Sequence, residues 1–421
     1  MGIGVLVVSG ALGLFGLHLY GANRLKNARS DFDARWGHLV LEPTPTVLPD
    51  HINGARWLMA GSQAIICSLD DRKFIGALSG EPARGWTDTE QARARWILHE
   101  QQNALGILLR SGSFDAFHLG PNGSRATYDE IDFLSIVMGL RLLTVEARLA
   151  WTEGRTSDCL TALDAVSQAT DGLLRTPIVM TSTIGSAAAR WTAWAAAELL
   201  SDPCASTATL EKLRDLLPSE DPIHRCDVTL TTSIAEIADE RLDYVEDLHD
   251  PSVSWSLPSW VSNRYLFEDL AVAEVLERWG RFLEIGHRPA ADWPADAART
   301  GWGDAEWPPW MALAGTFTPN LLSARIRAQA ASTDIQQLKA ALDLLLASPE
   351  GLDENSCSLV EDTRPTVLTG KPVSCGHSVD RGTIVIEVPE AEQTLSAFVS
   401  AANQASRFPP IEIPVGGCDP E

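Results

Sequence analysis

Residues 131–174 read IDFLSIVMGLRLLTVEARLAWTEGRTSDCLTALDAVSQATDGLL, and this stretch decides the fold class. Its apolar residues recur at steps of three and four, which is the period of an amphipathic helix. In the first half these residues are Ile131, Leu134, Met138, Leu142, Val145 and Leu149, and in the second half Leu160, Leu163, Val166 and Leu173. Gly154 separates the two sets with a short turn, so we expect two antiparallel neighbouring helices.

The same helical period extends through most of the chain. We expect further helices over 23–40, 51–67, 87–110, 177–200, 207–217, 221–248, 266–286 and 320–347. Two capping boxes, Thr87–Glu90 and Thr127–Glu130, mark helix starts because each pair can satisfy free amide groups of a first helical turn. Gly112 is a suitable helix end.

Strand-like sequence is confined to the C-terminal part. β-Branched runs and glycine-containing turns predict one β-hairpin at 366–388, and a short helix is expected within 390–405. The predicted fold class is therefore mainly α, an irregular antiparallel helical domain with a small C-terminal β-hairpin. A degenerate helical repeat is the alternative, although no fixed period is visible in the sequence.

Residues 2–22, GIGVLVVSGALGLFGLHLYGA, contain no charged residue. A helix of this length spans roughly 31 Å, about the thickness of the hydrocarbon core of a bilayer. A cleavable signal peptide would have a charged start and a small-x-small cleavage site, and the segment has neither. We expect a transmembrane helix here that inserts into the lipid bilayer, with a buried helix of a soluble protein as the alternative.

The anchor divides the chain into four expected parts. These are a transmembrane anchor at 1–23, a stalk and Pro-rich linker at 24–50, an α-helical domain at 51–348, and a C-terminal hairpin segment with its tail at 349–421. Basic residues directly after the anchor would place the body in the cytoplasm by the positive-inside rule. Plausible cysteine pairs argue for the opposite side, and long domains translocate regardless of modest flanking charge. We expect a single-pass protein of the bacterial inner membrane with a periplasmic body.

Composition excludes several classes of protein. The 421 residues include 56 acidic and 33 basic side chains, which gives a net charge of −23. Such a charge repels nucleic acid backbones, so we expect no nucleic acid partner. Hydrophobic residues make up 45% and charged residues 21%, which is ordinary for a globular protein and excludes wholesale disorder.

Catalytic motifs are absent from the sequence. We find no P-loop, no G-x-G-x-x-G after a strand, no H-E-x-x-H and no G-x-S-x-G. We therefore expect no enzyme activity, no cofactor and no metal. A hydrolase whose site is assembled from distant residues, such as His118, His224 or His287 with nearby carboxylates, is the alternative.

Four of the seven cysteines form two candidate disulfides. Cys357 with Cys375 would tie the hairpin to the last helix, and Cys204 with Cys226 would staple the short helix between them. For the first pair, a metal site with His377 and Cys418, or free thiols, are the alternatives; for the second, two unrelated thiols. Cys67 and Cys159 are expected in the core.

Tryptophans gather in the irregular stretch at 287–319. Trp293, Trp302, Trp307 and Trp310 could form a partner surface for a glycan, another small ligand or a peptide, since Trp supplies flat contact area. Core or domain packing is the alternative, because Trp is also a large core residue.

Several segments carry a family resemblance. They are Ile52-Asn-Gly-Ala-Arg-Trp57, which is a degenerate Asn-Ala-Ala motif, Ala147-Arg-Leu-Ala-Trp-Thr-Glu-Gly154 followed by Ala162-Leu163, and Thr369-Gly-Lys-Pro372. With the anchor and linker, this layout resembles uncharacterised membrane-anchored helical proteins of environmental bacteria such as acidobacteria and planctomycetes. The last segment is also similar to the Gly-x-Pro hairpin of type II secretion pseudopilins, but Thr366-Val-Leu-Thr369 replaces its Asp-Pro-Phe and Ser374 its Tyr.

The resemblance implies anchoring and an extracytoplasmic helical domain, and it implies no activity. The function that we expect is a membrane-anchored scaffold or protein-interaction module with an unidentified protein partner. An anchored hydrolase and a small-ligand or glycan-binding module that uses the stretch at 287–319 are the alternatives.

Overall fold

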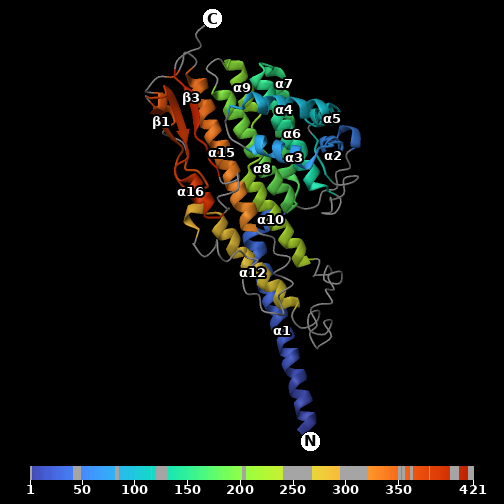
Figure 1. Cartoon of the computed structure of the whole chain (residues 1–421). Coiled ribbons are helices and arrows are strands. Elements are labelled where there is room, and N and C mark those ends of the chain that lie inside the picture. The colour runs from blue at the N-terminus through green and yellow to red at the C-terminus, as the bar shows by residue number, and fades with distance from the viewer. Residues whose placement is uncertain are drawn as a thin grey trace. The chain divides into compact units, whose positions relative to one another are not determined.

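The fold comes from a computed structural model of the chain (Figure 1). It describes residues 2–40, 49–80, 85–114, 116–119, 131–201, 205–239, 268–293, 321–348, 352, 356–360, 364–378, 380–398 and 407–415. Within these ranges the side chains are described from Phe15 onward, except at positions 50, 237–239, 268, 271, 321–322 and 359. The chain divides into two compact units. One contains residues 1–42, 227–288 and 293–322, and the other contains residues 43–226, 289–292 and 323–421.

The larger unit is mainly helical, as the sequence predicts. Its helices are α2 (Gly54–Gln63), α3 (Leu69–Gly80), α4 (Asp88–Glu100), α5 (Gln102–Ser111), α6 (Phe133–Thr152), α7 (Thr156–Arg175), α8 (Val179–Leu200), α9 (Thr207–Asp215), α15 (Leu321–Ala347) and α16 (Ala391–Ser396), with α10 (Pro222–Asp239) crossing the division. Short 3-10 turns lie at Asp50–Ile52, Ala290–Asp292 and Ser356–Leu359. Helix lengths from 6 to 27 residues fit an irregular domain better than repeats of fixed length.

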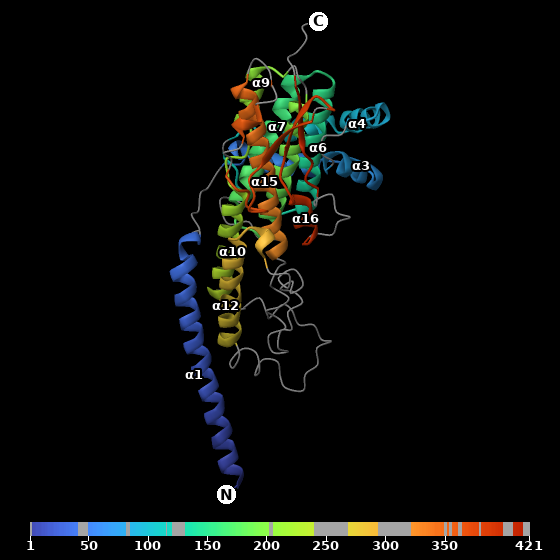
Figure 2. The ribbon, with the colours of Figure 1, turned by 90° about the vertical axis from the view of Figure 1, so that its left-hand side faces the viewer.

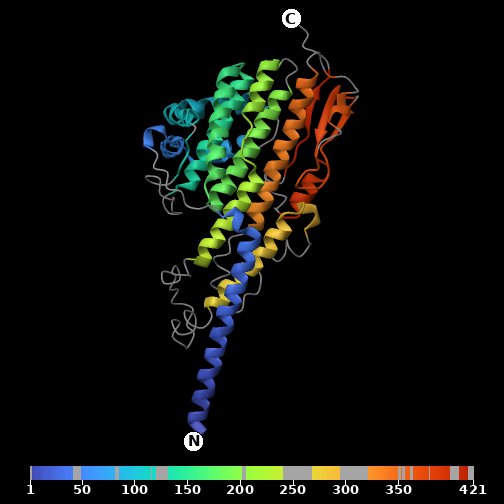
Figure 3. The same ribbon diagram turned by 180° about the vertical axis from the view of Figure 1, so that it is seen from behind.

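Helices α6, α7 and α8 lie side by side and form the centre of this unit (Figure 3). The short turn between α6 and α7 contains Gly154, whose φ of 71° is a conformation that glycine adopts without strain. The core between these helices and α2 to α5 is apolar and includes Leu58, Ile75, Leu108, Leu142 and Val166. The predicted antiparallel pair at 131–174 is confirmed, with one correction: Leu134, expected on the apolar face, is 82% exposed at the start of α6.

Local capping explains where several helices begin. Thr87 and Glu90 form the predicted capping box at the start of α4. The start of α6 is capped by Asp132, whose side chain accepts a hydrogen bond from the amide of Ser135. The expected capping box at Thr127–Glu130 lies outside the described residues.

The helix predicted over 87–110 is interrupted at Gln101, which corrects that expectation. The Gln101 side chain accepts a hydrogen bond from the Ile66 amide at 3.0 Å and donates one to the Ile66 carbonyl at 2.8 Å. Helix α5 then ends at Ser111, with Gly112 as its C-cap. A Cβ atom at Gly112 would lie 2.7 Å from the Cα of Ala165, so glycine is required here by the close approach of α7.

The C-terminal part contains three strands where the sequence predicts two. Strands β1 (Ser374–Ser378) and β2 (Thr383–Glu387) form the expected hairpin, and β3 (Ile411–Pro414) adds an antiparallel third strand in the order β1-β2-β3. The sheet lies along α15 (Figures 1 and 3). Strand β3 has only four residues and follows two prolines, which makes its sequence signal weak.

The smaller unit contains α1 (Gly2–Trp36), its 3-10 extension Gly37–Leu39, the C-terminal part of α10 and helix α12 (Glu268–Gly286). Helices α1 and α12 pack along each other (Figure 2). The helix predicted for the stalk is confirmed, and it is continuous with the helix of residues 2–22. Among the residues whose side chains are described, no helix combines the length and the apolar character needed to cross a bilayer. The expected anchor overlaps that set only from Phe15 onward, so it remains a prediction.

Candidate functional site

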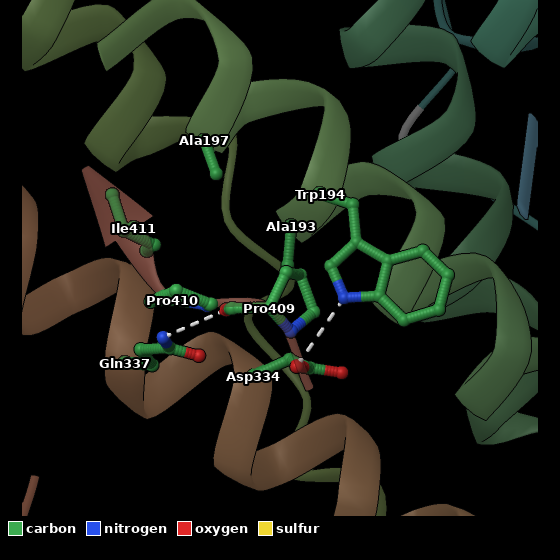
Figure 4. Close-up of a pocket in the computed structure, with 8 residues that line it drawn as sticks. All are labelled: Ala193, Trp194, Ala197, Asp334, Gln337, Pro409, Pro410 and Ile411. Carbon is green, nitrogen blue, oxygen red and sulfur yellow. Dashed lines mark hydrogen bonds between the residues drawn. The ribbon is translucent and has the colours of Figure 1, made fainter. Parts of the chain in front are cut away.

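A small pocket lies between α8, α15 and the segment that leads into β3 (Figure 4). Its lining residues are Ala193, Trp194, Ala197, Asp334, Gln337, Pro409, Pro410 and Ile411. The space inside holds about a single water molecule. The pocket is therefore a small gap within the packing, and its polar side chains join the elements around it.

The carboxylate of Asp334 is the central group of this pocket. It is 3% exposed and accepts a hydrogen bond from Nε of Arg190 at 2.5 Å. A second hydrogen bond comes from Nε1 of Trp194 at 3.3 Å (Figure 4). Burial raises the pKa of Asp334 to about 6, even though the guanidinium of Arg190 acts in the opposite direction. Asp334 thus joins α15 to α8 through one ion pair and one indole hydrogen bond.

Arg190 extends the same connection to the C-terminal segment. Its Nη2 donates a hydrogen bond to the carbonyl oxygen of Arg407 at 2.7 Å. Its guanidinium lies over the rings of Trp194 and Phe408, each at 4.7 Å from the ring centroid. Such stacking suits the planar guanidinium, which binds carboxylates and aromatic faces at once. One buried cation therefore connects α8, α15 and the strand segment.

Gln337 fixes the sheet from the α15 side. Its Nε2 donates to the carbonyl oxygens of Ile386 in β2 at 2.9 Å and of Pro409 at 3.1 Å. Ser201, just after α8, adds a hydrogen bond to the carbonyl of Glu412 in β3. These contacts satisfy main-chain groups of a short sheet that would otherwise be costly to bury.

The chemistry available in this pocket is narrow. Acid–base catalysis needs a titratable group within hydrogen-bond reach of a bound substrate, and the pocket has room for a water molecule only. Asp334 is the one ionisable residue among the lining residues, and both of its oxygens are engaged. The arrangement fits a structural role, in which these side chains hold α8, α15 and the C-terminal sheet together.

The exposure of the apolar side chains of α1 changes along the helix. Three large apolar side chains near its N-terminal half are exposed: Phe15 at 59%, Leu19 at 47% and Tyr20 at 60%. From Gly21 onward, the side that faces α12 is buried, with Ala28, Phe32 and Trp36 at intervals of four. Among its described side chains, this continuous helix therefore has an exposed apolar part at residues 15–20 and a packed part from Gly21 onward.

Ion pairs join the packed part of α1 to α12. Arg24 donates to Glu277 at 2.7 Å and also pairs with Glu274, and Arg35 pairs with Glu284 at 2.5 Å. Glu274 receives a further bond from Arg278, and these cations lower its pKa against the effect of burial. The charged rows lock the two helices in one register.

The structure places the candidate cysteines as follows. Cys357 and Cys375 form a disulfide with Cα atoms 5.3 Å apart, which joins the 3-10 turn Ser356–Leu359 to β1 and confirms that pairing. Cys226 is buried, and its proposed partner Cys204 lies outside the described residues. Cys159 is fully buried, and burial raises the pKa of its thiol to about 12. That environment keeps the thiol protonated and unreactive.

Of the four tryptophans that were expected to form a partner surface, the structure describes only Trp293. Trp293 is 5% exposed, and its Nε1 donates to the carbonyl of Arg288 at 3.0 Å. Its ring is therefore buried, as expected for the alternative in which the tryptophan is a packing residue. Trp302, Trp307 and Trp310 lie outside the described residues.

The three histidines of the hydrolase alternative have separate surroundings. The main chain of His118 is hydrogen-bonded to the side chain of Asn53, His224 is exposed, and His287 stacks on Trp36 at 5.2 Å and lies 3.9 Å from Asp227. In the described part of the chain, no three His, Cys, Asp or Glu side chains are grouped so as to hold a metal ion.

The buried pair of Arg190 and Asp334 is missed by sequence reasoning. Both residues lie on predicted helices at positions 144 apart, and only the fold brings them together. A weak signal existed, because Asp334 and Arg190 interrupt otherwise apolar helix faces, and a buried charge needs a partner.

Comparisons with known proteins give no match. No family model, no curated protein and no solved structure is similar to this chain.

Proposed function

We propose that this protein is a membrane-anchored helical scaffold, with residues 2–22 in the bilayer and the helical body on the extracytoplasmic side of a bacterial inner membrane. The observation that carries the proposal is the exposure of Phe15, Leu19 and Tyr20 on α1. Single exposed apolar residues are normal, but three within two turns of an uncharged helical segment indicate a surface that another apolar phase covers.

The disulfide between Cys357 and Cys375 supports the extracytoplasmic side. Disulfides persist in oxidising compartments such as the bacterial periplasm, whereas cytoplasmic thiols are kept reduced. The bond closes an 18-residue separation and holds the edge strand β1 against the turn before it. The presence of this bond therefore supports a periplasmic body.

The scaffold role is supported by a rigid apolar projection on the body. Ile66 is 86% exposed and Leu69 is 68% exposed, on the loop between α2 and α3 and at the start of α3. The two hydrogen bonds between Gln101 and the main chain of Ile66 hold this loop in place. Preordered apolar side chains are favourable contact points for a protein partner, because less conformational entropy is lost on binding.

The anchor is tested by membrane extraction of the full chain. We expect the protein to resist alkaline carbonate and to float with liposomes. The substitution Leu12→Arg should release it, because an arginine at the centre of a membrane helix costs about 3 kcal/mol. Ala34→Arg places the same charge on an exposed position of α1 beyond Gly21 and should leave the protein in the membrane. Extraction of the unsubstituted chain by carbonate would refute the anchor.

The orientation is tested with C-terminal reporter fusions in a bacterial host. An active alkaline phosphatase fusion together with a dark fluorescent-protein fusion would support the periplasmic body. The reverse pair of results would place the body in the cytoplasm and refute that part of the proposal.

The partner surface is tested by crosslinking in intact cells. We expect Ile66→Asp to remove a crosslinked product, and Ile52→Asp, at a second exposed isoleucine, to retain it.

A further inference from the structure

The first turn of α12 lies beside the last uncharged turn of the expected anchor. A Cβ atom built at Gly21 would lie 3.3 Å from Cγ of Leu270 and 3.4 Å from Cβ of Asp269. Gly21 itself is buried, so the absence of a side chain lets α12 approach α1 at this point. Beyond Gly21 toward the N-terminus, Leu19 and Tyr20 are exposed.

The two helices run in the same direction. Residues of increasing number on α1 meet residues of increasing number on α12: Gly21 meets Leu270, Arg24 meets Glu274 and Glu277, Arg35 meets Glu284, and Trp36 stacks on His287. With parallel helices and a rise of about 1.5 Å per residue, Arg281 lies roughly 18 Å further along the pair than Asp269.

The ion pairs limit where a bilayer surface can cross this helix pair. Arg24, Glu274 and Glu277 form a charged group that is costly inside hydrocarbon. The apolar run of α1 ends two residues earlier, at Ala22, and the polar but uncharged Asn23 follows it. If α1 is inserted, the hydrocarbon boundary therefore lies close to Gly21, which is the level of Leu270.

We propose that the N-terminal turn of α12, around Asp269 and Leu270, lies at the lipid headgroup surface and forms a second membrane contact beside α1. This inference rests on the proposed anchor, because it takes its level from the end of the inserted segment. The partner is the surface of a phospholipid bilayer. The contact would fix the angle at which the helix pair leaves the membrane. With α1 as the one contact the pair could tilt freely, whereas two adjacent contacts hold it in one direction.

The test uses three variants of the full chain, each with one added cysteine that is labelled, reconstituted in phosphatidylcholine vesicles with a headgroup-proximal spin-labelled lipid. Asn23→Cys reports the boundary on α1, Asp269→Cys reports the start of α12, and Arg281→Cys is the matched control at an exposed position of α12. Each carries an environment-sensitive fluorophore, and the labelled unsubstituted chain gives the background of native cysteines.

We expect the spin-labelled lipid to quench the labels at Asn23→Cys and Asp269→Cys at least twofold and to leave Arg281→Cys unchanged. Quenching at Asn23→Cys alone would overturn the inference and keep the anchor. Quenching of all three would also overturn it, because α12 would then lie flat on the bilayer. Failure of the vesicles to carry the protein on flotation would refute the anchor itself.

The substitution Asp269→Cys could itself change the start of α12, so hydrogen exchange on unlabelled chains gives a second measurement without it. We expect the amides of residues 269–272 to exchange at least fivefold more slowly in the anchored chain than in the Leu12→Arg chain in solution. The amides of residues 279–283 should exchange equally in both. Equal exchange at 269–272 would overturn the contact.

Discussion

The buried ion pair between Arg190 and Asp334 allows a prediction in which the two single substitutions differ. Asp334→Ala leaves the guanidinium of Arg190 inside the protein, where it is 4% exposed and retains the carbonyl of Arg407 as a partner. Removing one partner of a buried pair typically costs 3–5 kcal/mol, because the remaining charge is uncompensated. We expect Asp334→Ala to lower the free energy of unfolding by about 4 kcal/mol.

The substitution Arg190→Met has a milder expected effect. Without the guanidinium, the pKa of Asp334 should rise above its value of about 6, so the carboxyl group can bind a proton and become neutral at pH 7. Methionine also retains apolar contact with Trp194 and Phe408. The double variant Arg190→Met/Asp334→Leu buries no charge and should be the most stable of the three, within about 1 to 2 kcal/mol of the unsubstituted protein.

The pH dependence of stability provides the second half of this prediction. Because the pKa of Asp334 is raised in the folded state, the folded protein binds a proton that the unfolded chain releases between about pH 4 and pH 6. The contribution of Asp334 to stability is therefore full below about pH 4 and is lost as the pH rises through 6. A shift of about two units corresponds to about 3 kcal/mol.

The assay is urea unfolding of the detergent-solubilised chain, followed by tryptophan fluorescence at pH 4.5 and pH 7.5. The control is Asp334→Asn, which keeps the size of the side chain and an oxygen that can accept hydrogen bonds but does not titrate. We expect the difference in stability between the two pH values to change by about 2 kcal/mol between the unsubstituted chain and this variant. An unchanged difference, or Arg190→Met being as damaging as Asp334→Ala at pH 7.5, would refute the reasoning.

Three further substitutions test local features of the fold, each by the same urea unfolding. Gly112→Ala should destabilise the protein by about 1 to 3 kcal/mol, because its methyl group would collide with the backbone of α7; a neutral effect would contradict that close approach. The Cys357→Ser/Cys375→Ser pair should cost about 3 kcal/mol, and reduction of the unsubstituted protein should reproduce the loss. Thr87→Ala should cost about 1 kcal/mol through loss of the α4 cap, with no change expected from Thr161→Ala, at an exposed position within α7.

Features that depend on neighbouring residues could be predicted from the sequence. The Thr87 capping box, the turn at Gly154 and the apolar period at 131–149 act within one or two helical turns. The first two lie where the pattern predicts them, and of the six apolar positions at 131–149 all but Leu134 are buried. The hairpin of β1 and β2 belongs to the same class, since its strands are joined by a short turn. Helix boundaries and antiparallel neighbours follow from these local signals.

Features that depend on distant residues could not be predicted in the same way. The break at Gln101 is due to hydrogen bonds with Ile66, 35 positions away, and nothing in the helical pattern of 87–110 indicates it. Strand β3 becomes a strand because β2 is available to pair with it, although only Ile411 and Ile413 show alternation. The ion pair at Asp334 belongs to the same group, because propensity and period contain no information about partners.

The pairing of α1 with α12 shows how distant packing adds to a sequence argument. The sequence alone shows an uncharged segment followed by a polar helix, and it does not say what the polar part contacts. Among the described side chains, Gly21 marks the point where α1 gains a partner, two residues before the uncharged run ends at Asn23. Two independent properties, charge and packing, therefore change within one helical turn. A helix buried along its whole length in a soluble body would show no such coincidence, and the position of Gly21 is for this reason an argument in support of the proposed anchor.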